Sequence, residues 1–266
     1  MNFKVTVLGS GTSTGIPIVG CHCKVCTSKN SKDKRLRASL LIETHEQKIL
    51  IDSGPDLRYQ MLRNQIDNID AVLYTHFHYD HLGGLDDLRP FSQRRANGLD
   101  CWCNEQTYDE ILSKYPYLKK VSGNHNLPVI HLKRYEGSLA HGYNIHSFGS
   151  LQIKPIRLIH VPPDIVYSVG FVVNERFGYL TDFRIIHDDD LEFLQNLEVL
   201  FIGAPLARQH PTHCTHSEAL DYFERFKVGT GVVGHLAHSL SHDELTEKWS
   251  GRAVPAYDGQ VFSFDD

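Results

Sequence analysis

The sequence lacks several features that would assign a function class directly. It has no long run of Lys and Arg, and a formal charge of −5 with an isoelectric point near 6.4 argues against a nucleic-acid backbone as the main partner. No segment contains about 18 uninterrupted apolar residues, and the first apolar strand breaks at Gly9, so neither a membrane span nor a secretory signal is expected. We therefore expect a cytoplasmic protein that does not act on membranes.

Low-complexity linkers and strong internal repeats are also missing. Of the 266 residues, 41% are hydrophobic, which suffices for a sizeable core. One domain over residues 1–266 is therefore the simplest organisation. The stretch 115–150 has the least clear pattern.

The glycine-rich segment GSGTSTG at 9–15 does not have the features of a nucleotide cradle. It lacks the Lys-Ser/Thr pair of a P-loop, and Pro17 follows where a helix would have to start. We expect a tight turn that shapes one wall of a site.

Hydrophobic alternation predicts short strands in both halves of the chain. In the first half the expected strands cover 3–8, 39–43, 48–54, 71–75 and 101–103, and in the second half 151–160, 166–174, 177–182, 197–203 and 231–235. Helices are expected over 56–63, 104–115 and 217–226, with another after Gly84. Two successive halves of this kind predict an α/β protein, an αββα four-layer sandwich with its helices outside two sheets.

The densest group of ionisable residues is THFHYDHLGG, which follows the strand at 71–75. His76 and His78 are two residues apart and share one side of an extended segment, and the next turn can bring Asp80 and His81 to the same side. Imidazoles with a carboxylate suit a pair of hydrolytic metal ions, Mn, Zn or Fe. The alternative is a solvated loop with scattered histidines.

The H-x-H-x-D-H signature resembles that of the metallo-beta-lactamase superfamily, whose αββα fold holds a dinuclear site between the sheets. In IDSG, Asp52 matches the D-x-G element of that superfamily. The resemblance implies that Asp52 is a buried carboxylate that orients a metal-bound histidine. A plain turn residue is the alternative.

The superfamily pattern also implies three further ligands downstream. His160 ends the strand IKPIRLIH, Asp182 ends FGYLTD where a bridging carboxylate would lie, and His235 ends GVVGH. Each closes an apolar run, which places all three at one edge of the sandwich. Each could instead be a capping or turn residue.

A second metal site is expected at GCHCKVC, where Cys21, Cys23 and Cys26 are three soft ligands for tetrahedral Zn. His238 is the candidate fourth ligand, and His22 is the competing one. A loop of three reduced cysteines is the alternative without metal.

Together, LGSGTSTGIP, C-x-C-x-x-C, H-x-H-x-D-H, TD, PTH and the final H-x-x-H resemble the phosphoribosyl 1,2-cyclic phosphate phosphodiesterases of phosphonate breakdown and their relatives. The resemblance covers nearly the whole chain. It implies a structural Zn on the cysteines and last histidine, and a substrate-side histidine in PTH, His213. We expect two divalent cations, Mn or Zn, and hydrolysis of a small phosphorylated substrate by a metal-bridging hydroxide, with Asp80 and His213 as catalytic residues.

Three other activities fit parts of this pattern. They are a tRNA 3′-processing type of endonuclease, a thioester or lactone hydrolase, and a non-catalytic binding protein similar to the one in pyrroloquinoline quinone biosynthesis. The first is disfavoured because no basic, Gly/Pro-rich arm able to grip tRNA is present in the sequence. The sequence does not fix the oligomeric state, and a homodimer is one arrangement compatible with it.

Overall fold

The computed structural model describes residues 2–119, 129–161 and 166–266. Its first sheet has the order β17 (Val261–Phe264), β1 (Phe3–Gly9), β2 (Ser39–Glu43), β3 (Lys48–Ile51), β4 (Ala71–Leu73), β5 (Leu99–Cys103) and β6 (Ile130–Arg134). The second has the order β13 (Ile185–Ile186), β10 (Leu151–Val161), β11 (Val166–Val173), β12 (Phe177–Leu180), β14 (Val199–Gly203), β15 (Thr230–Gly234) and β16 (Val254–Pro255), with β9 (His146–Phe148) paired to β10. A small hairpin joins β7 (Gly137–Ser138) to β8 (Gly142–Tyr143).

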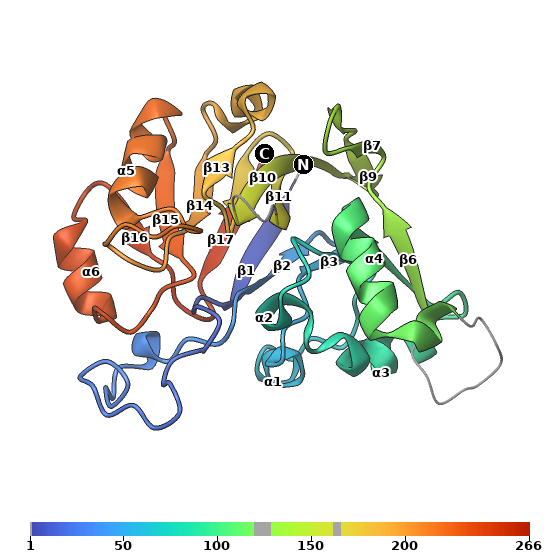
Figure 1. The fold of residues 1–266 in the computed structure, drawn as a ribbon, viewed down its shortest axis with the longest axis horizontal. Helices are drawn as coiled ribbons and strands as arrows, with labels where there is room; N and C mark the ends of the chain where they lie inside the picture. The colour runs from blue at the N-terminus through green and yellow to red at the C-terminus, as the bar shows by residue number, and fades with distance from the viewer. Residues whose placement is uncertain (1, 120–128, 162–165) are drawn as a thin grey trace.

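Helices cover the outer faces of both sheets (Figure 1). On one side lie α1 (Leu57–Arg63), α2 (Tyr79–Leu82), α3 (Arg89–Gln93) and α4 (Glu105–Lys114), and on the other α5 (His216–Arg225) and α6 (His242–Lys248). Short 3-10 helices occur at η1 (Ser31–Asp33), η2 (Leu85–Leu88), η3 (Pro116–Lys119) and η4 (Asp188–Leu194). None of the helices in the described part of the chain is long and apolar enough to cross a membrane.

Three apolar layers lie between these four structural layers, because successive strand residues point to opposite faces. In β2, Leu40 and Ile42 pack between the two sheets with residues such as Phe171, while Leu41 packs outward toward α1. Outside the second sheet, Leu200 packs against Phe223 of α5 and other residues of the outer layer. Strands buried on both faces explain the nearly continuous apolar runs in the sequence, and the αββα sandwich is confirmed.

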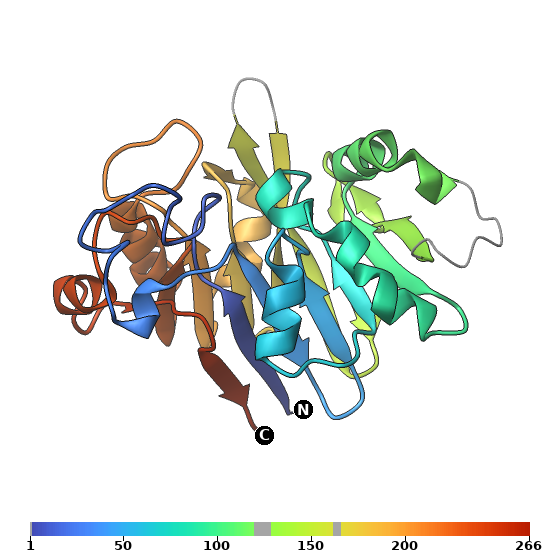
Figure 2. The same cartoon turned by 90° about the horizontal axis from the view of Figure 1, so that it is seen from below.

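The direction of the strands determines which residues meet. From β3 to β6 the neighbouring strands are parallel, as they are from β12 to β16. Parallel strands bring their carboxyl ends to one edge of a sheet. Asp52 and His76 follow β3 and β4 at that edge of the first sheet, and Asp182 and His235 follow β12 and β15 at the edge of the second. The two chain ends lie side by side on the paired strands β1 and β17 (Figure 2).

Most element predictions hold, with differences at their ends. The strand expected over 71–75 ends at Leu73, and the one expected over 177–182 ends at Leu180, because the residues that follow leave the sheet to form the site. After Gly84 the chain forms a 3-10 turn before α3, which has Pro90 in its first turn. The unclear stretch contains β6 to β9, and residues 120–128 of it lie outside the described part.

Candidate metal centre

The histidine motif leaves β4 and enters α2. His76 is fully buried, His78 is half-buried at the residue before α2, and their ring centroids lie 4.5 Å apart. His160, near the end of β10, joins them with centroid distances of 5.2 Å to His76 and 5.0 Å to His78. One ligand atom from each residue lies within 4.8 Å of the others, so the three imidazoles could hold one metal ion.

Asp80, His81 and His235 form a second group of the same kind. His81 Nε2 lies 3.2 Å from Asp80 Oδ2, and His235 Nε2 lies 3.6 Å from the same oxygen. The first two residues are in α2, and His235 directly follows β15 of the other sheet. The second group therefore joins the two sheets around a carboxylate with two imidazoles, which could hold another divalent cation.

Asp182 lies between the two groups. Its Oδ2 is 3.1 Å from His81 Nε2 and 3.2 Å from His235 Nε2, and its Oδ1 is 3.9 Å from His160 Nε2. The Thr181 hydroxyl donates a hydrogen bond of 2.7 Å to Oδ2, which holds the carboxylate in this orientation. One oxygen toward each group is the arrangement that a bridging ligand requires.

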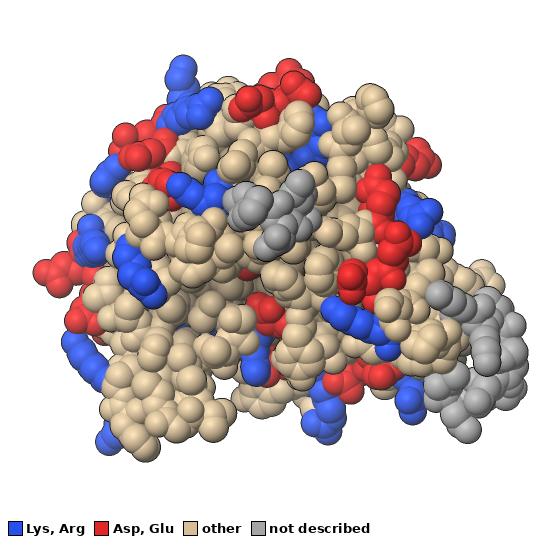
Figure 3. Space-filling view, in the orientation of Figure 1, with Lys and Arg blue, Asp and Glu red and all other residues tan. Residues whose placement is uncertain are grey.

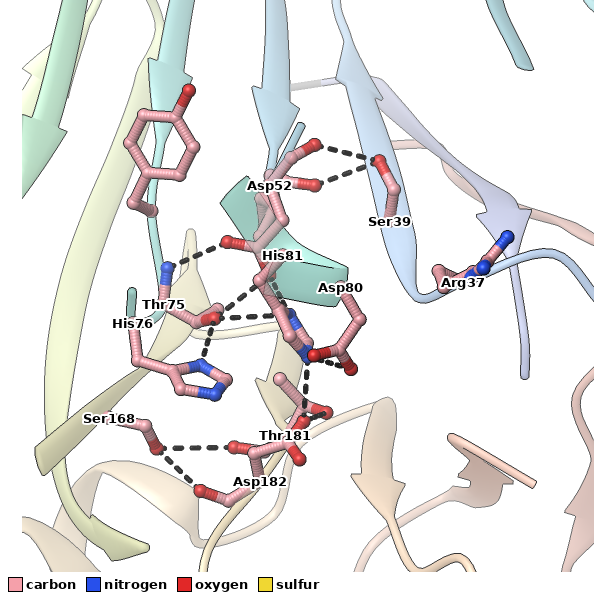
Figure 4. Close-up of polar contacts among 12 residues, drawn as sticks. Arg37, Ser39, Asp52, Thr75, His76, Asp80, His81, Ser168, Thr181 and Asp182 are labelled. Carbon is pink, nitrogen blue, oxygen red and sulfur yellow. Dashed lines mark hydrogen bonds and ion pairs between the residues drawn. The ribbon is translucent and has the colours of Figure 1, made fainter. Parts of the chain in front are cut away.

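Asp52 fixes the orientation of His81 from behind, as Figure 4 shows. The two side chains are fully buried, and His81 Nδ1 donates to Asp52 Oδ2 at 2.7 Å. The backbone N–H and hydroxyl of Thr75 also donate to the Asp52 carboxylate, at 2.8 and 2.9 Å. The structure therefore places Asp52 where a histidine-orienting carboxylate is expected, because Nδ1 is occupied and Nε2 faces the metal groups.

The same reasoning fixes two more imidazoles. The Thr75 hydroxyl uses its proton on Asp52, so the 3.0 Å contact between Thr75 Oγ1 and His76 Nδ1 requires the imidazole to donate. His160 Nδ1 likewise donates to the Thr212 carbonyl oxygen at 3.0 Å. Each ring is left with Nε2 unprotonated, which is the state that binds a metal ion.

Three residues of the site have the same unusual backbone conformation. Asp52, Asp182 and His235 have φ values of 61°, 51° and 54°, in the left-handed region that few non-glycine residues adopt. Each comes just after a strand end, and the turn directs its side chain back across the sheet edge. Such conformations cost roughly 1–3 kcal/mol each and cluster at functional sites.

A close backbone approach explains the glycine of the D-x-G element. A Cβ atom added to Gly54 would lie 2.1 Å from the Asp80 carbonyl oxygen, and one added to Gly84 would lie 2.2 Å from the Gly54 carbonyl oxygen. Any side chain at Gly54 would therefore push α2, with Asp80 and His81, away from the first sheet.

Burial and charge shape the protonation states. Burial opposes a charge on His81, but the carboxylates of Asp80, Asp52 and Asp182 outweigh it and raise the His81 pKa well above its usual range. Burial lowers the pKa of His76 well below its usual range, with a further contribution from His81. Burial also opposes the charge on Asp182, yet His235 and His81 hold its pKa well below the ordinary value. Without metal, His76 is thus neutral and Asp182 ionised, whereas His81 is protonated, so binding of a cation at His81 Nε2 would release a proton.

The donor atoms fit divalent cations. The Nε2 atoms of His76, His81 and His235 are buried, and none makes a well-aligned hydrogen bond within the described residues, although carboxylate oxygens lie 3.1 Å from that of His81 and 3.2 Å from that of His235. A buried polar atom without a partner costs about 1–3 kcal/mol, and a coordinated cation would satisfy several at once.

His213 lies beside the first group. Its Nδ1 is 3.6 Å from Asp182 Oδ1, and its ring centroid is 4.9 Å from that of His160. It is more open than its neighbours, with 17% of its side chain exposed against 4% for His160. Burial, with nearby histidines, lowers the pKa of His213 to about 3. Its position permits contact with a metal ion or with a substrate oxygen.

The predicted cysteine site is assembled as a separate cluster. Cys21, Cys23 and Cys26 place their Sγ atoms 3.5, 3.4 and 3.5 Å from His238 Nδ1. Ligand atoms at about 2.3 and 2.0–2.1 Å around a tetrahedral zinc would lie about 3.6 Å apart. A hydrogen bond from the Cys26 backbone N–H, with neighbouring side-chain contacts, lowers the pKa of Cys23 to about 6, which favours the thiolate that zinc binds. His22 is not part of this group.

Comparison with known proteins gives the family. A family model described as a beta-lactamase superfamily domain matches residues 47–236, the segment that contains both metal groups. The chain belongs to the metallo-beta-lactamase superfamily. A solved structure of a diphosphatase from the PhnP family is 33% identical with a TM-score of 0.88, and the alignment covers 99% of this chain and 98% of that one. The chain is thus similar over almost its whole length to a protein described as a diphosphatase.

Two curated relatives carry other names. An octanoyltransferase of Porphyromonas gingivalis is 37% identical over 99% of this chain, but the chain spans only 52% of that protein's length. An exodeoxyribonuclease, WalJ, of Streptococcus pneumoniae is 30% identical over 84% of this chain and 77% of its own length. The proteins that match this chain therefore include two named for phosphorus chemistry and one named for acyl transfer.

The structure adds two residues that the sequence reasoning missed. Thr75 connects Asp52 with His76, and Thr212 orients His160. Both threonines stand next to a selected histidine, in YTHFH and PTH, which is the one signal that could have found them. Arg37 pairs with Asp56 at 2.8 Å and donates to the Ser13 carbonyl oxygen, so it secures the turn at 9–15.

Proposed function

We propose that this chain is a dinuclear metal-dependent phosphodiesterase that hydrolyses a small cyclic phosphate, such as 5-phosphoribosyl 1,2-cyclic phosphate. The supporting observation is the position of Asp182, with one carboxylate oxygen toward each of two buried ligand groups. The residues that would hold the two cations, Mn or Zn, are His76, His78, Asp80, His81, His160, Asp182 and His235. Cations bound there would lower the pKa of a water molecule and neutralise charge on phosphoryl oxygens.

The chain's own residues supply orientation and proton handling. Asp52 and Thr75 fix the rings that face the reacting phosphate. A neutral His213, the form expected at pH 7 from its lowered pKa, donates a hydrogen bond to the departing ribose oxygen. Asp80, the buried carboxylate of the second group, accepts a proton in addition to its role as a ligand. The cysteine cluster holds a structural zinc that keeps the N-terminal loop in place.

Hydrolysis of a diphosphate bond is a second candidate. The neighbour from the PhnP family, which is similar over almost the whole chain, is called a diphosphatase. A phosphoanhydride presents the same non-bridging oxygens to the cations as a cyclic diester does. The two reactions differ in the leaving group, a phosphate or an alkoxide, and the alkoxide depends more strongly on His213.

DNA hydrolysis, suggested by the exodeoxyribonuclease relative, has less support. A nuclease of this kind needs Lys and Arg along the path of the phosphate backbone. On the face in Figure 3, acidic and basic side chains of the described residues are interspersed, and the chain carries a net charge of −5.

Acyl transfer is also less well supported. The octanoyltransferase name belongs to a protein of about twice this length. Cys214, two residues before α5 and next to His213, is 1% exposed, and burial raises its pKa far above that of a reactive thiol. The described site thus has no activated cysteine to carry an acyl group.

Phosphorus NMR tests the proposal. Metal-loaded protein is incubated with 5-phosphoribosyl 1,2-cyclic phosphate, inorganic diphosphate, a single-stranded oligodeoxynucleotide and an octanoyl thioester, the last monitored by thiol release. We expect the cyclic phosphate to open with the highest kcat/KM. Preferred cleavage of diphosphate would select the second candidate. Turnover of the thioester alone, or of none of the compounds, would reject phosphodiester hydrolysis.

A further inference from the structure

The loop from Leu206 to Thr215 carries a second histidine that the proposed mechanism does not use. Its ends are pinned together, because Leu206 pairs with Thr215 and its carbonyl oxygen accepts from the His216 backbone N–H at 3.1 Å. Figure 2 shows this segment, in orange, projecting from the sandwich. The loop is therefore held at its base while His210 and its neighbours remain near the solvent.

Thr212 determines the tautomer of His210. Its backbone N–H donates to His210 Nδ1 at 3.3 Å, and its hydroxyl lies 3.1 Å from the same nitrogen. Since Nδ1 accepts, the ring proton of the neutral imidazole is on Nε2. Within the described residues this N–H has no hydrogen-bond partner, so His210 presents a free donor.

His210 contacts His213, which in turn contacts the first metal group, so His210 lies beyond His213. The two ring centroids are 5.0 Å apart and tilted by 47°, and His213 is in turn 4.9 Å from His160. Thr212 connects His160 with His210, because its carbonyl oxygen orients the His160 ring and its backbone N–H orients the His210 ring. A substrate whose reacting phosphorus lies at the metal groups would bring a group remote from that phosphorus toward His210.

The same loop also carries a positive charge. Arg208, two residues before His210, is exposed and makes no hydrogen bond or ion pair with any residue in the described part of the chain. A neutral N–H donor with a free guanidinium suits an anionic group, and a phosphate above all.

We infer that His210, supported by Arg208, is a specificity-determining residue that binds a second phosphate group of the substrate. The inference rests on the proposed function and narrows its substrate class to compounds with one reacting and one spectator phosphate. The Nε2–H of His210 donates to an oxygen of the spectator phosphate, and no bond to that phosphate is broken.

Binding of two product-like ligands tests this inference without turnover. Ribose 1,5-bisphosphate and ribose 1-phosphate differ only in the second phosphate, and each is titrated calorimetrically into the metal-loaded chain. We expect the bisphosphate to bind about 10–100-fold more tightly, the range of one or two hydrogen bonds to a charged group. His210→Ala should remove most of this ratio, and His210→Gln, which keeps an N–H donor, should restore part of it.

His45→Ala is the matched control, because His45 lies in the turn after β2 with 86% of its side chain exposed. It should keep the full ratio. Equal affinities in the wild type, or a ratio that survives His210→Ala, would overturn the inference. Turnover of 5-phosphoribosyl and ribosyl 1,2-cyclic phosphates distinguishes failure of the proposed function from failure of the inference about His210. If neither compound is hydrolysed, the proposed function is rejected, while the binding ratio still decides the role of His210.

Discussion

His235 and His238 are three residues apart and belong to different clusters. His235 Nε2 is 3.2 Å from Asp182 Oδ2, and His238 Nδ1 is 3.4 Å from Cys23 Sγ. The residue after His235, Leu236, exchanges backbone hydrogen bonds with the turn at 9–15, through Ser10 and Thr12. The N-terminal loop and one side of the metal centre are therefore built on the same short segment.

Loss of the cysteine cluster should consequently affect both regions. In Cys26→Ser we expect zinc content to fall by about one ion per chain and the melting temperature by roughly 5–10 °C, which for a chain of this size corresponds to about 2–3 kcal/mol. Elemental analysis and thermal unfolding measure the two effects. Cys103→Ala, in β5, should keep its zinc, and unchanged zinc in Cys26→Ser would contradict the assignment.

Removal of the carboxylate behind His81 should weaken the centre. Asp52→Asn still fills the space but accepts poorly from His81 Nδ1, so we expect metal affinity to fall about 10–100-fold. Competition with a fluorescent chelator measures this affinity. Asp67→Asn is the control, since 84% of that side chain is exposed. Equal affinity in the two variants would show that Asp52 does not act through His81.

His213 should matter for turnover more than for metal content. We expect His213→Ala to lower turnover of a cyclic phosphate about 10²–10⁴-fold, the range of general acid–base groups, and to retain both cations. Loss of one cation in this variant would instead make His213 a ligand. Unchanged turnover would remove it from the mechanism.

The same residue gives a pH dependence in the metal-free chain. The pKa of His213 is about 3 when folded and 6.5 without the protein environment, so below pH 6.5 the unfolded chain takes up a proton that the folded chain does not. The free energy of unfolding should therefore fall as the pH drops from about 6.5 toward 3, because in this range only the unfolded chain is protonated at His213. Urea unfolding of metal-free wild type and His213→Gln at pH 7.5 and 4.5 tests this. The wild type should lose about 1–3 kcal/mol more than the variant, and equal losses would contradict the shift.

A large part of this molecule could be predicted from its sequence. The αββα arrangement follows from short apolar runs that end in polar residues. Helix α6 was missed, although Ser241 and Glu244 form a capping box that signals its start.

What escaped prediction depends on contacts between distant segments. Nothing in the residue pattern shows that Asp52, Asp182 and His235 adopt left-handed backbone conformations, since glycine is the usual signal and is absent at these positions. The relay from Asp52 through Thr75 to His76 likewise appears only when β3 and β4 lie side by side. The ligands could thus be predicted from residue type, whereas the residues that hydrogen-bond to them could be identified only from the folded structure.

The most direct test of the dinuclear centre is elemental analysis of protein purified without added metal, combined with turnover of bis-p-nitrophenyl phosphate after addition of Mn or Zn. The predicted result is about three metal ions per fully loaded chain, of which one zinc survives mild chelation, with phosphodiesterase activity that returns when Mn or Zn is restored. A single tightly held zinc and no turnover with any added metal would contradict a dinuclear phosphodiesterase and favour a binding protein.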